Sequence, residues 1–386
     1  MKEALLRKLD EFDWECEKED TRYLTHDFHP YSSKYIPQIP RNLILTLSKK
    51  GDTVLDCFVG SGTTLVECSL LGRNAIGVDI NPLGCLISKV KATPIDPQIL
   101  KVKIHELLER IQDDISAERG ILRISSYTSR TISNPMSILE VPFSSYIKYW
   151  FQPHVIKELL VIKRHINAID DTDIRDFFLV AFSSIIRGVS DAASGFGNIM
   201  RSKNPPEKRR TFEKFASRLR YMYSKMEEFS AKADDSVRIK VVLGDTKTLR
   251  SFITERVDMI CTHPPYMASV PYAEYQKLSL WWLGYDPRKL DAELIGGQRT
   301  REDTAERYLG EMSACFREMY EVLKEGGYCC VVIGNPLWRG KVWPLNEMFK
   351  EMGRDCGFLF AKEIVRGKYK MTMGKMKKEY ILIFKK

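Results

Sequence analysis

The amino-acid sequence predicts an α/β fold with a mostly parallel central sheet and a mainly helical insertion. Two observations lead to this prediction. In the first and last thirds of the chain, apolar strand-like runs alternate with helix-like segments, which is typical of a parallel sheet covered by helices on both faces. Between about residues 95 and 237 this alternation stops. We therefore expect residues 1–94 and 238–386 to build one sheet together, and residues 95–237 to form the insertion.

The individual elements follow from the apolar runs. In the first part, strands are expected at 53–56 and 75–79, on either side of a helix over residues 63–71. In the last part, the expected elements are strands at 239–243, 258–261 and 328–333, a helix at 305–323 and a closing strand at 379–384.

The insertion carries helical periodicity. Apolar residues recur at three- and four-residue spacing, first at 104, 107, 108 and 111 and again at 155, 159, 162 and 166. A long apolar stretch also covers residues 177–186. These patterns predict helices for this part of the chain.

The composition is that of a soluble globular protein of 386 residues. It has 60 basic and 51 acidic residues, and the net charge of +9 is consistent with a polyanionic partner. The nine cysteines show no C-x-x-C spacing and the six histidines no metal-type spacing, so we expect reduced thiols, no metal site and a cytoplasmic location. No apolar stretch approaches the ~18 residues that span a bilayer, so no membrane is expected as a partner.

A glycine loop at residues 56–64 reads Asp-Cys-Phe-Val-Gly-Ser-Gly-Thr-Thr and stands between a predicted strand and a predicted helix. Glycines there let a ligand approach the backbone closely. Asp79 ends the next strand, where a carboxylate can accept hydrogen bonds from both hydroxyls of a ribose. The loop has no lysine after Gly62 and has Leu65 where a third glycine would stand. An adenosine without a pyrophosphate therefore fits better than a nucleoside triphosphate or a dinucleotide, and Asp245 could bind its amino group.

Residues 262–266 read Thr-His-Pro-Pro-Tyr and directly follow a predicted strand. Prolines cannot continue a central strand, so the chain must turn there and leave carbonyl acceptors beside an aromatic ring. This corner suits a flat ring that carries an amino group. The alternative for both motifs is structural: turn glycines with surface aspartates, and a plain turn with a core tyrosine.

Together these motifs resemble the S-adenosylmethionine-dependent DNA amino-methyltransferases of the N4-cytosine and N6-adenine type. The glycine loop resembles their cofactor loop, residues 77–81 (Gly-Val-Asp-Ile-Asn) their ribose-binding strand, and residues 262–266 their catalytic motif. Residues 28–37 (Phe-His-Pro-Tyr-Ser-Ser-Lys-Tyr-Ile-Pro) are similar to the segment that cradles the methionine end of the cofactor. The resemblance covers roughly residues 25–95 and 238–386.

The resemblance implies a Rossmann-like methyltransferase that uses S-adenosylmethionine, releases S-adenosylhomocysteine and acts on double-stranded DNA, with a cognate restriction endonuclease as a candidate partner. It assigns to the cofactor Tyr31, Ser33, Lys34, Asp56, Phe58, Gly60, Gly62, Thr63, Thr64, Asp79, Ile80, Asn81 and Asp245. It assigns to catalysis His263, Pro264, Pro265 and Tyr266. Two residues depart from the family pattern: Cys57 replaces a proline, and His263 replaces Asp, Asn or Ser.

The chemistry of an amino group explains the corner. The lone pair of an exocyclic amine is delocalised into the base, and hydrogen-bond acceptors aimed at its N–H bonds favour a nitrogen that can attack a methyl group. The Pro264 carbonyl and a neutral His263 are the candidate acceptors, and Tyr266 is expected to stack on a base that has left the duplex. The alternative is a structural His263, with Pro264 as the essential acceptor. By resemblance, Thr262 slightly favours cytosine N4 over adenine N6, because N4-cytosine enzymes carry Thr-Ser-Pro-Pro-Tyr and many N6-adenine enzymes carry Asp-Pro-Pro-Tyr.

Basic residues point to a nucleic-acid path in the insertion, which makes residues 95–237 a candidate DNA-recognition region. The candidate contacts are Arg201, Lys203, Lys208, Arg209 and Arg210, with Lys368 and Lys370 near the last strand. A solvated helix face is the alternative for such a run of charges. Two other functions stay open: an RNA guanine-N2 methyltransferase, whose corner is similar, and an inactive nucleic-acid-binding protein of the same fold.

Overall fold

The computed structural model describes residues 2–125, 143–193, 199–205, 210–267, 271–297, 302–367 and 378–386. Its centre is a seven-stranded sheet in the order β3-β2-β1-β4-β5-β9-β8. The strands are β1 (Thr53–Asp56), β2 (Asn74–Asp79), β3 (Ile239–Leu243), β4 (Val257–Thr262), β5 (Leu323–Gly334), β8 (Leu359–Arg366) and β9 (Glu379–Lys385). The pairs from β3 to β5 are parallel, and β9 is antiparallel to both of its neighbours. The predicted α/β fold with a mostly parallel sheet is confirmed.

The middle of the sheet joins the two separate parts of the chain. In β1, Leu55 is paired with Ile76 of β2 on one side and with Ile260 of β4 on the other. Parallel neighbours end at the same edge of a sheet, and ligands bind outside the carboxyl ends of such strands. The residues that follow β1, β2, β3 and β4 therefore meet at one edge, which brings the glycine loop and the corner after β4 together.

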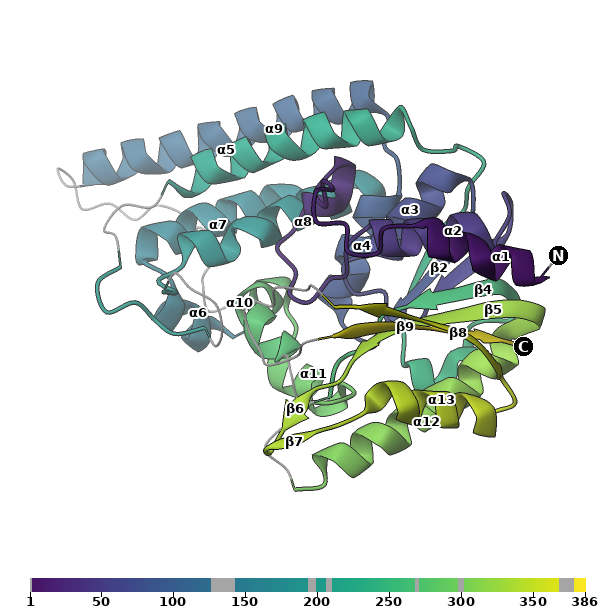
Figure 1. Ribbon diagram of the computed structural model, residues 1–386. Coiled ribbons are helices and arrows are strands. Elements are labelled where there is room, and N and C mark those ends of the chain that lie inside the picture. Colours follow the sequence, from purple (N-terminus) through teal and green to yellow (C-terminus); the bar gives the residue numbers. More distant parts are fainter. Residues whose placement is uncertain are drawn as a thin grey trace.

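Helices cover both faces of the sheet (Figure 1). One face is covered by α2 (Gln38–Leu47), α3 (Thr63–Leu71) and α4 (Pro82–Ala92), and the other by η4 (Thr246–Ser251), α12 (Thr304–Val322) and α13 (Leu345–Asp355). The central strands are thus buried on both faces, which explains why they appear in the sequence as uninterrupted apolar runs.

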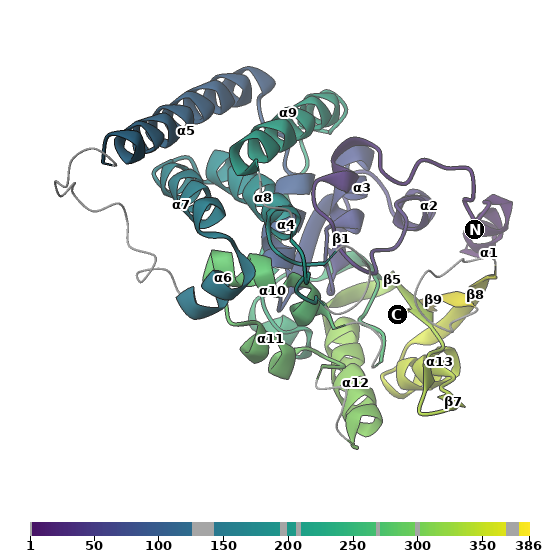
Figure 2. The ribbon, with the colours of Figure 1, turned by 90° about the vertical axis from the view of Figure 1, so that its left-hand side faces the viewer.

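The insertion is helical, as predicted. It contains α5 (Pro97–Ser125), α6 (Ser144–Trp150), α7 (Pro153–Asn167), α8 (Thr172–Val189) and α9 (Thr211–Ser230). The apolar stretch at 177–186 lies in α8, which packs against α4, α7, α9 and α10 (Tyr272–Leu283). Figures 1 and 2 show the insertion stacked on the side of the sheet that carries α3 and α4, away from α12 and α13. Within the described ranges, no helix is both long and apolar enough to cross a membrane.

Several elements were not predicted. Among them are α1 (Lys2–Lys8), α11 (Pro287–Glu293), β8 and a small hairpin of β6 (Leu337–Trp338) and β7 (Lys341–Val342). β8 is the edge strand of the sheet, most of its residues are exposed or half-buried, and charged residues interrupt its apolar run, so its sequence gives little strand signal. The nine cysteines are all free thiols, as expected.

Candidate active site

The glycine loop connects β1 to α3 in a conformation that requires glycine at two positions. Gly60 has φ = 48° and Gly62 has φ = 78°, both in the left-handed region. A Cβ on Gly62 would lie 2.6 Å from the Cα of Ser88 in α4, so α4 can approach the loop only because Gly62 has no side chain. Lys91, also in α4, is buried and donates a hydrogen bond to the Ser61 carbonyl (2.6 Å), which fixes the loop from below.

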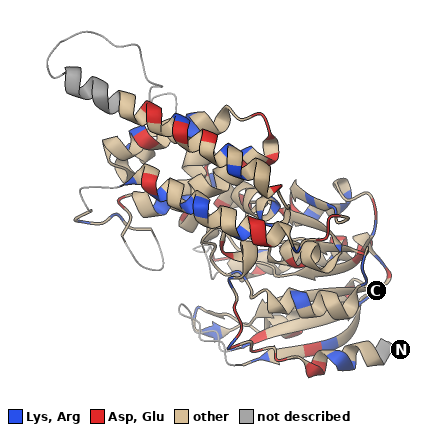
Figure 3. Ribbon diagram, turned by 90° about the horizontal axis from the view of Figure 1, so that it is seen from above, with Lys and Arg blue, Asp and Glu red and all other residues tan. Residues whose placement is uncertain are grey.

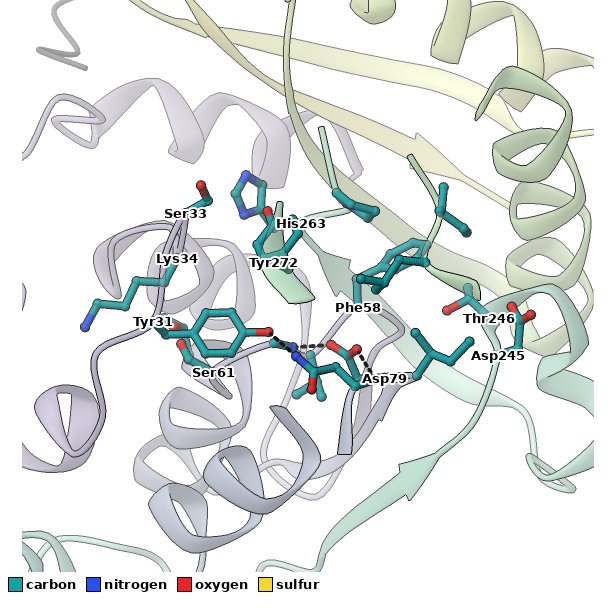
Figure 4. Close-up of a pocket in the computed structure, with 18 of the residues that line it drawn as sticks. Tyr31, Ser33, Lys34, Phe58, Ser61, Asp79, Asp245, Thr246, His263 and Tyr272 are labelled. Carbon is teal, nitrogen blue, oxygen red and sulfur yellow. Dashed lines mark hydrogen bonds between the residues drawn. The ribbon is translucent and has the colours of Figure 1, made fainter. Parts of the chain in front are cut away.

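A pocket opens between the glycine loop, the strand ends and the N-terminal segment (Figure 4). Ten of the thirteen residues predicted for a cofactor line it: Tyr31, Ser33, Lys34, Phe58, Gly60, Thr63, Asp79, Ile80, Asn81 and Asp245. Asp56, Gly62 and Thr64 do not line it. His263 and Pro265 from the corner after β4 lie in the wall of this same pocket.

Asp79 lies at the centre of the pocket, at the end of β2. Its Oδ2 accepts a hydrogen bond from the Gly60 amide (2.8 Å) and its Oδ1 accepts one from the Asn81 amide (2.9 Å). Burial raises the pKa of Asp79, and the amides of Asn81, Gly60 and Ile80 oppose that shift. The carboxylate is therefore held rigidly, with its remaining lone pairs available to a ligand. Asn81 is fixed in turn, because its side-chain amide donates to Gln276 (2.7 Å).

Asp245 and Phe58 lie together at one end of the pocket (Figure 4). One oxygen of Asp245 accepts from the Lys247 amide (2.9 Å) and thereby caps η4. The neighbouring Thr246 hydroxyl donates to the Cys57 carbonyl (2.5 Å), which ties the end of β3 to the glycine loop. An aromatic face and a carboxylate in one pocket can hold a flat ring that carries an amino group.

The pocket is acidic. Asp79, Asp245 and Glu293 are the carboxylates among its described lining residues. Lys34 also lines it, but its ammonium points away and donates to the His26 carbonyl (3.0 Å) (Figure 4). A phosphate-bearing ligand would be repelled here, whereas a ligand with cationic groups and hydroxyls would be attracted. The Ser61 hydroxyl is buried without a hydrogen-bond partner in the described part of the chain, so a ligand could satisfy it.

Asp56 supports the site from beneath. Its carboxylate accepts hydrogen bonds from the hydroxyls of Thr64 (2.6 Å) and Thr262 (2.7 Å) and from the Phe58 amide (3.2 Å). Burial raises the pKa of Asp56 to about 6, against the effect of these donors. Asp56 thus joins the ends of β1 and β4 to the start of α3. The structure places Asp56 and Thr64 in this support and outside the pocket wall.

The corner after β4 is held by a buried hydrogen-bond chain. The Tyr266 hydroxyl lies 2.8 Å from Nε2 of His263 and donates to Oε1 of Glu379 (2.7 Å). The other oxygen of Glu379 pairs with the Arg366 guanidinium. Burial lowers the pKa of His263, Glu379 raises it and Arg366 lowers it. The histidine is therefore neutral at neutral pH.

In the corner, Pro264 and Tyr266 are buried and Pro265 is partly exposed. Pro264 is buried, and no hydrogen bond within the described residues uses its carbonyl oxygen. The Pro265 carbonyl accepts from the Tyr308 hydroxyl (2.9 Å). The Tyr266 ring is only 7% exposed, so a base could stack on it only after the residues that cover it move.

The predicted nucleic-acid contacts are partly used within the protein. Arg201 pairs with Asp191 (3.2 Å) and lies over the Tyr149 ring. Lys203 and Arg210 are exposed. Lys208, Arg209, Lys368 and Lys370 lie outside the described residues. The two long helices of the insertion, seen from above, carry charges of both signs (Figure 3).

Sequence reasoning missed several pocket residues. They are Tyr35, Val59, Ser61, Gly244, Thr246, Tyr272, Glu293, Leu294 and Ile295. Tyr35 lies within the motif at residues 28–37, and Val59 and Ser61 lie within the glycine loop, so the sequence signal for these three was present. Tyr272 and residues 293–295 belong to no motif, and the packing of α10 against α8 and of α11 against α10 brings them to the pocket.

Comparison with known proteins identifies the family. A family model described as DNA methylase, N6_N4_Mtase, matches residues 10–89 and 257–386, which is more than half of the chain. The Type II methyltransferase M.MvaI of Kocuria varians is 31% identical over 304 residues, 72% of this chain and 63% of that protein. The Type II methyltransferase M.MjaII of Methanocaldococcus jannaschii is 24% identical over 430 residues, 92% of this chain and 78% of that protein.

The chain spans 63% of the length of the first of these relatives. A solved structure of a SAM-dependent methyltransferase from Methanosarcina mazei is 12% identical, and the match covers 89% of this chain and 96% of that chain with a TM-score of 0.35. The family match covers the glycine loop, the strand that ends in Asp79 and the corner at residues 262–266. The chain belongs to the N6_N4_Mtase family of DNA methylases, with a Rossmann-like methyltransferase fold and S-adenosylmethionine as the cofactor.

Proposed function

We propose that this protein transfers a methyl group from S-adenosylmethionine to an exocyclic amino group of a base in DNA. The observation that carries the proposal is the position of His263, which lies in the wall of the pocket that also contains Asp79 and Asp245. A hydrogen-bond acceptor and a cofactor pocket at one strand edge are what transfer to an amine requires. Membership of the DNA methylase family supports DNA as the substrate.

The residues present suit this cofactor. In our proposal Asp245 accepts from the adenine amino group beside Phe58, and Asp79 accepts from the ribose hydroxyls. Ser33 and Ser61 serve the methionine end. The three carboxylates of the pocket favour the sulfonium and ammonium charges of the cofactor. When bound, S-adenosylmethionine supplies a methyl group that the amine nitrogen takes up as the amine loses one proton, while the carbon–sulfur bonding pair stays on sulfur in S-adenosylhomocysteine.

The protein's part in the transfer is to accept hydrogen bonds from the amine. In this proposal the neutral His263 accepts a hydrogen bond from one N–H group of the amine, and the Pro264 carbonyl accepts a hydrogen bond from the other. Such fixed acceptors stabilise the nitrogen as its lone pair becomes available, and they need no rearrangement at the moment of reaction. The target base must leave the duplex to reach this pocket.

We retain cytosine N4 as the slightly preferred target over adenine N6. The preference rests on the resemblance of Thr262 to the threonine that opens the motif of N4-cytosine enzymes; the Thr262 side chain itself is buried and donates to Asp56. Thr262 therefore helps to fix the position of the corner, and in our proposal its effect on the base is indirect. In the insertion, we propose Lys203 and Arg210 as contacts to the DNA backbone, in line with the exposure of both side chains.

One experiment tests the activity, the substrate and the base together. The protein is incubated with radiolabelled S-adenosylmethionine and either genomic DNA or tRNA, and the product is digested to nucleosides. Label in N4-methylcytosine or N6-methyladenine supports the proposal and names the base. Label in N2-methylguanosine of tRNA would overturn it in favour of an RNA methyltransferase. Cofactor binding in calorimetry without transfer to either nucleic acid would indicate an inactive binding protein.

A further inference from the structure

The series of hydrogen bonds that supports His263 begins at residues far from it in the sequence. Arg366 ends β8 and Glu379 begins β9, and the two residues face each other as a cross-strand pair. Their side chains form a buried ion pair, and Glu379 then accepts from Tyr266. Arg366 is itself anchored, because its Nε donates to the Trp14 carbonyl (2.6 Å). The edge of the sheet thus supports a side chain in the pocket wall.

The direction of the hydrogen bonds in this chain follows from the number of protons. A carboxylate in an ion pair with arginine only accepts hydrogen bonds, so the single hydroxyl hydrogen of Tyr266 points to Glu379. The Tyr266 oxygen can then only accept from His263, 2.8 Å away. Nε2 of His263 must carry a hydrogen. In a neutral imidazole with hydrogen on Nε2, the lone pair is on Nδ1.

We propose that Tyr266, Glu379 and Arg366 are positioning residues that hold His263 as the neutral Nε2–H tautomer, so that Nδ1 is the atom that accepts a hydrogen bond from the target amine. The proposal rests on the proposed function and deepens it. Nε2 is turned toward Tyr266, and the same ring lines the pocket, so Nδ1 is the nitrogen left for a ligand. In this scheme the hydroxyl of Tyr266 acts through His263.

The charges around His263 also keep the ring neutral. From β9, Glu379 lies 4.0 Å from Nε2, and from β8, Arg366 neutralises that carboxylate. From the N-terminal segment, the Tyr35 ring lies 5.1 Å from the imidazole, centroid to centroid. Without Arg366, Glu379 would draw a second proton onto the ring and Nδ1 would become a donor. With the ion pair in place, burial lowers the pKa of His263 and Nδ1 stays an acceptor.

A spectrum that needs no substrate tests the tautomer. Long-range ¹H–¹⁵N NMR of protein labelled in histidine distinguishes a protonated from an unprotonated ring nitrogen, and His263→Asn identifies the signal by its loss. We expect hydrogen on Nε2 and none on Nδ1 at pH 7.5 in the wild type, and a mixture of tautomers in Tyr266→Phe. Hydrogen on Nδ1 in the wild type would overturn the proposal. This result does not depend on methyl transfer, so failure of the proposed function is separately visible.

A double-mutant cycle tests the consequence for catalysis. Tyr266→Phe keeps the ring and removes the hydroxyl, and we expect kcat to fall by roughly tenfold or more with little change in cofactor binding. In a His263→Asn background the acceptor is an amide oxygen, which has no tautomer, so the same change should alter kcat by less than about threefold. An equal loss in both backgrounds contradicts the proposal. Tyr320→Phe, on α12, controls for removal of a tyrosine hydroxyl elsewhere.

Discussion

At the scale of single residues, the pocket uses side chains whose hydrogen-bonding capacity is only partly filled by the protein. Asp79 accepts hydrogen bonds from backbone amides alone and lines the pocket, where it can still accept from a ligand. Asp56 lies nearby but outside the pocket wall, and its carboxylate accepts from the hydroxyls of Thr64 and Thr262 as well as from a backbone amide. The two aspartates therefore have different tasks, which their neighbours decide.

Replacement of Asp79 should weaken cofactor binding. In Asp79→Asn one of the two oxygens becomes an NH₂ group, which must face the amide of Gly60 or Asn81 and cannot accept from it. With a charged acceptor also lost, we expect the Kd for S-adenosylmethionine to rise by roughly 10–100-fold, as measured by calorimetry. Asp235→Asn, an exposed aspartate after α9, is the control and should bind normally. Equal affinity of Asp79→Asn and the wild type would contradict the assignment.

The protonation of His263 should be visible in the pH–rate profile. Only the neutral ring can accept a hydrogen bond, and its pKa is lowered from the usual 6.5 by burial. Activity should stay level from pH 8 down to about pH 6.5 and fall at lower pH, by about tenfold per pH unit once the ring is protonated. Asn does not titrate, so His263→Asn should lack this acid limb. The same acid limb in both proteins would assign the titration to another group.

At the scale of elements, the glycine loop shows how packing between helices shapes a binding site. The loop is pressed against α4, because Gly62 leaves no Cβ between them, and Lys91 holds the Ser61 carbonyl from that helix. The ends of β1 and β4 are joined through Asp56 to α3. The position of the pocket wall therefore depends on contacts among α3, α4 and the sheet.

A matched pair of glycine substitutions separates backbone strain from this packing. Gly51 has φ = 84°, and a Cβ on it would have no other atom within 4 Å, whereas a Cβ on Gly62 would lie 2.6 Å from the Ser88 Cα. We expect Gly51→Ala to lower the free energy of unfolding by about 1 kcal/mol and Gly62→Ala by roughly 2–4 kcal/mol, measured by urea unfolding. Only Gly62→Ala should also weaken cofactor binding. Equal losses for the two variants would show that packing against α4 is unimportant.

At the scale of the whole molecule, one edge of the sheet collects the functional groups of both parts of the chain. The helical insertion stands beside this edge on the face that carries α3 and α4 (Figure 2). A duplex that delivers a base to the pocket must lie across the carboxyl ends of the strands. Exposed cations on that side are in a position to contact its phosphates, whereas cations at the opposite edge are not.

The salt dependence of DNA binding should report these contacts. Replacement of Lys203 and Arg210 by alanine should weaken binding and reduce the slope of log K against log salt by about 1.8, because each phosphate contact contributes roughly 0.9. Lys49 and Lys50 precede β1 at the other edge of the sheet, so the double alanine variant at these positions should leave the slope unchanged. Fluorescence anisotropy with a labelled duplex at several salt concentrations measures both. Equal slopes in the two double variants would exclude Lys203 and Arg210 from the interface.

Local spacing in the sequence determined most of the fold and the core of the site. The central strands could be predicted because both of their faces are buried, which makes them apolar throughout. The glycine loop, Asp79 and the corner at 262–266 each lie at the end of a strand. Seven of the ten predicted cofactor residues in the pocket lie at or just after these strand ends, whereas Tyr31, Ser33 and Lys34 come from the N-terminal segment. β8 was not readable, since an edge strand has no continuous apolar run.

Only the tertiary structure decided what surrounds these motifs. Glu379 is 113 residues from Tyr266 in the sequence, and the register of β8 and β9 on the sheet brings it and Arg366 to the corner. Glu293 and Tyr272 reach the pocket through the packing of α10 and α11. The sequence by itself therefore determined which groups this protein would use, because those groups lie next to strand ends. The structure decided the protonation and support of those groups, because these depend on contacts between distant parts of the chain.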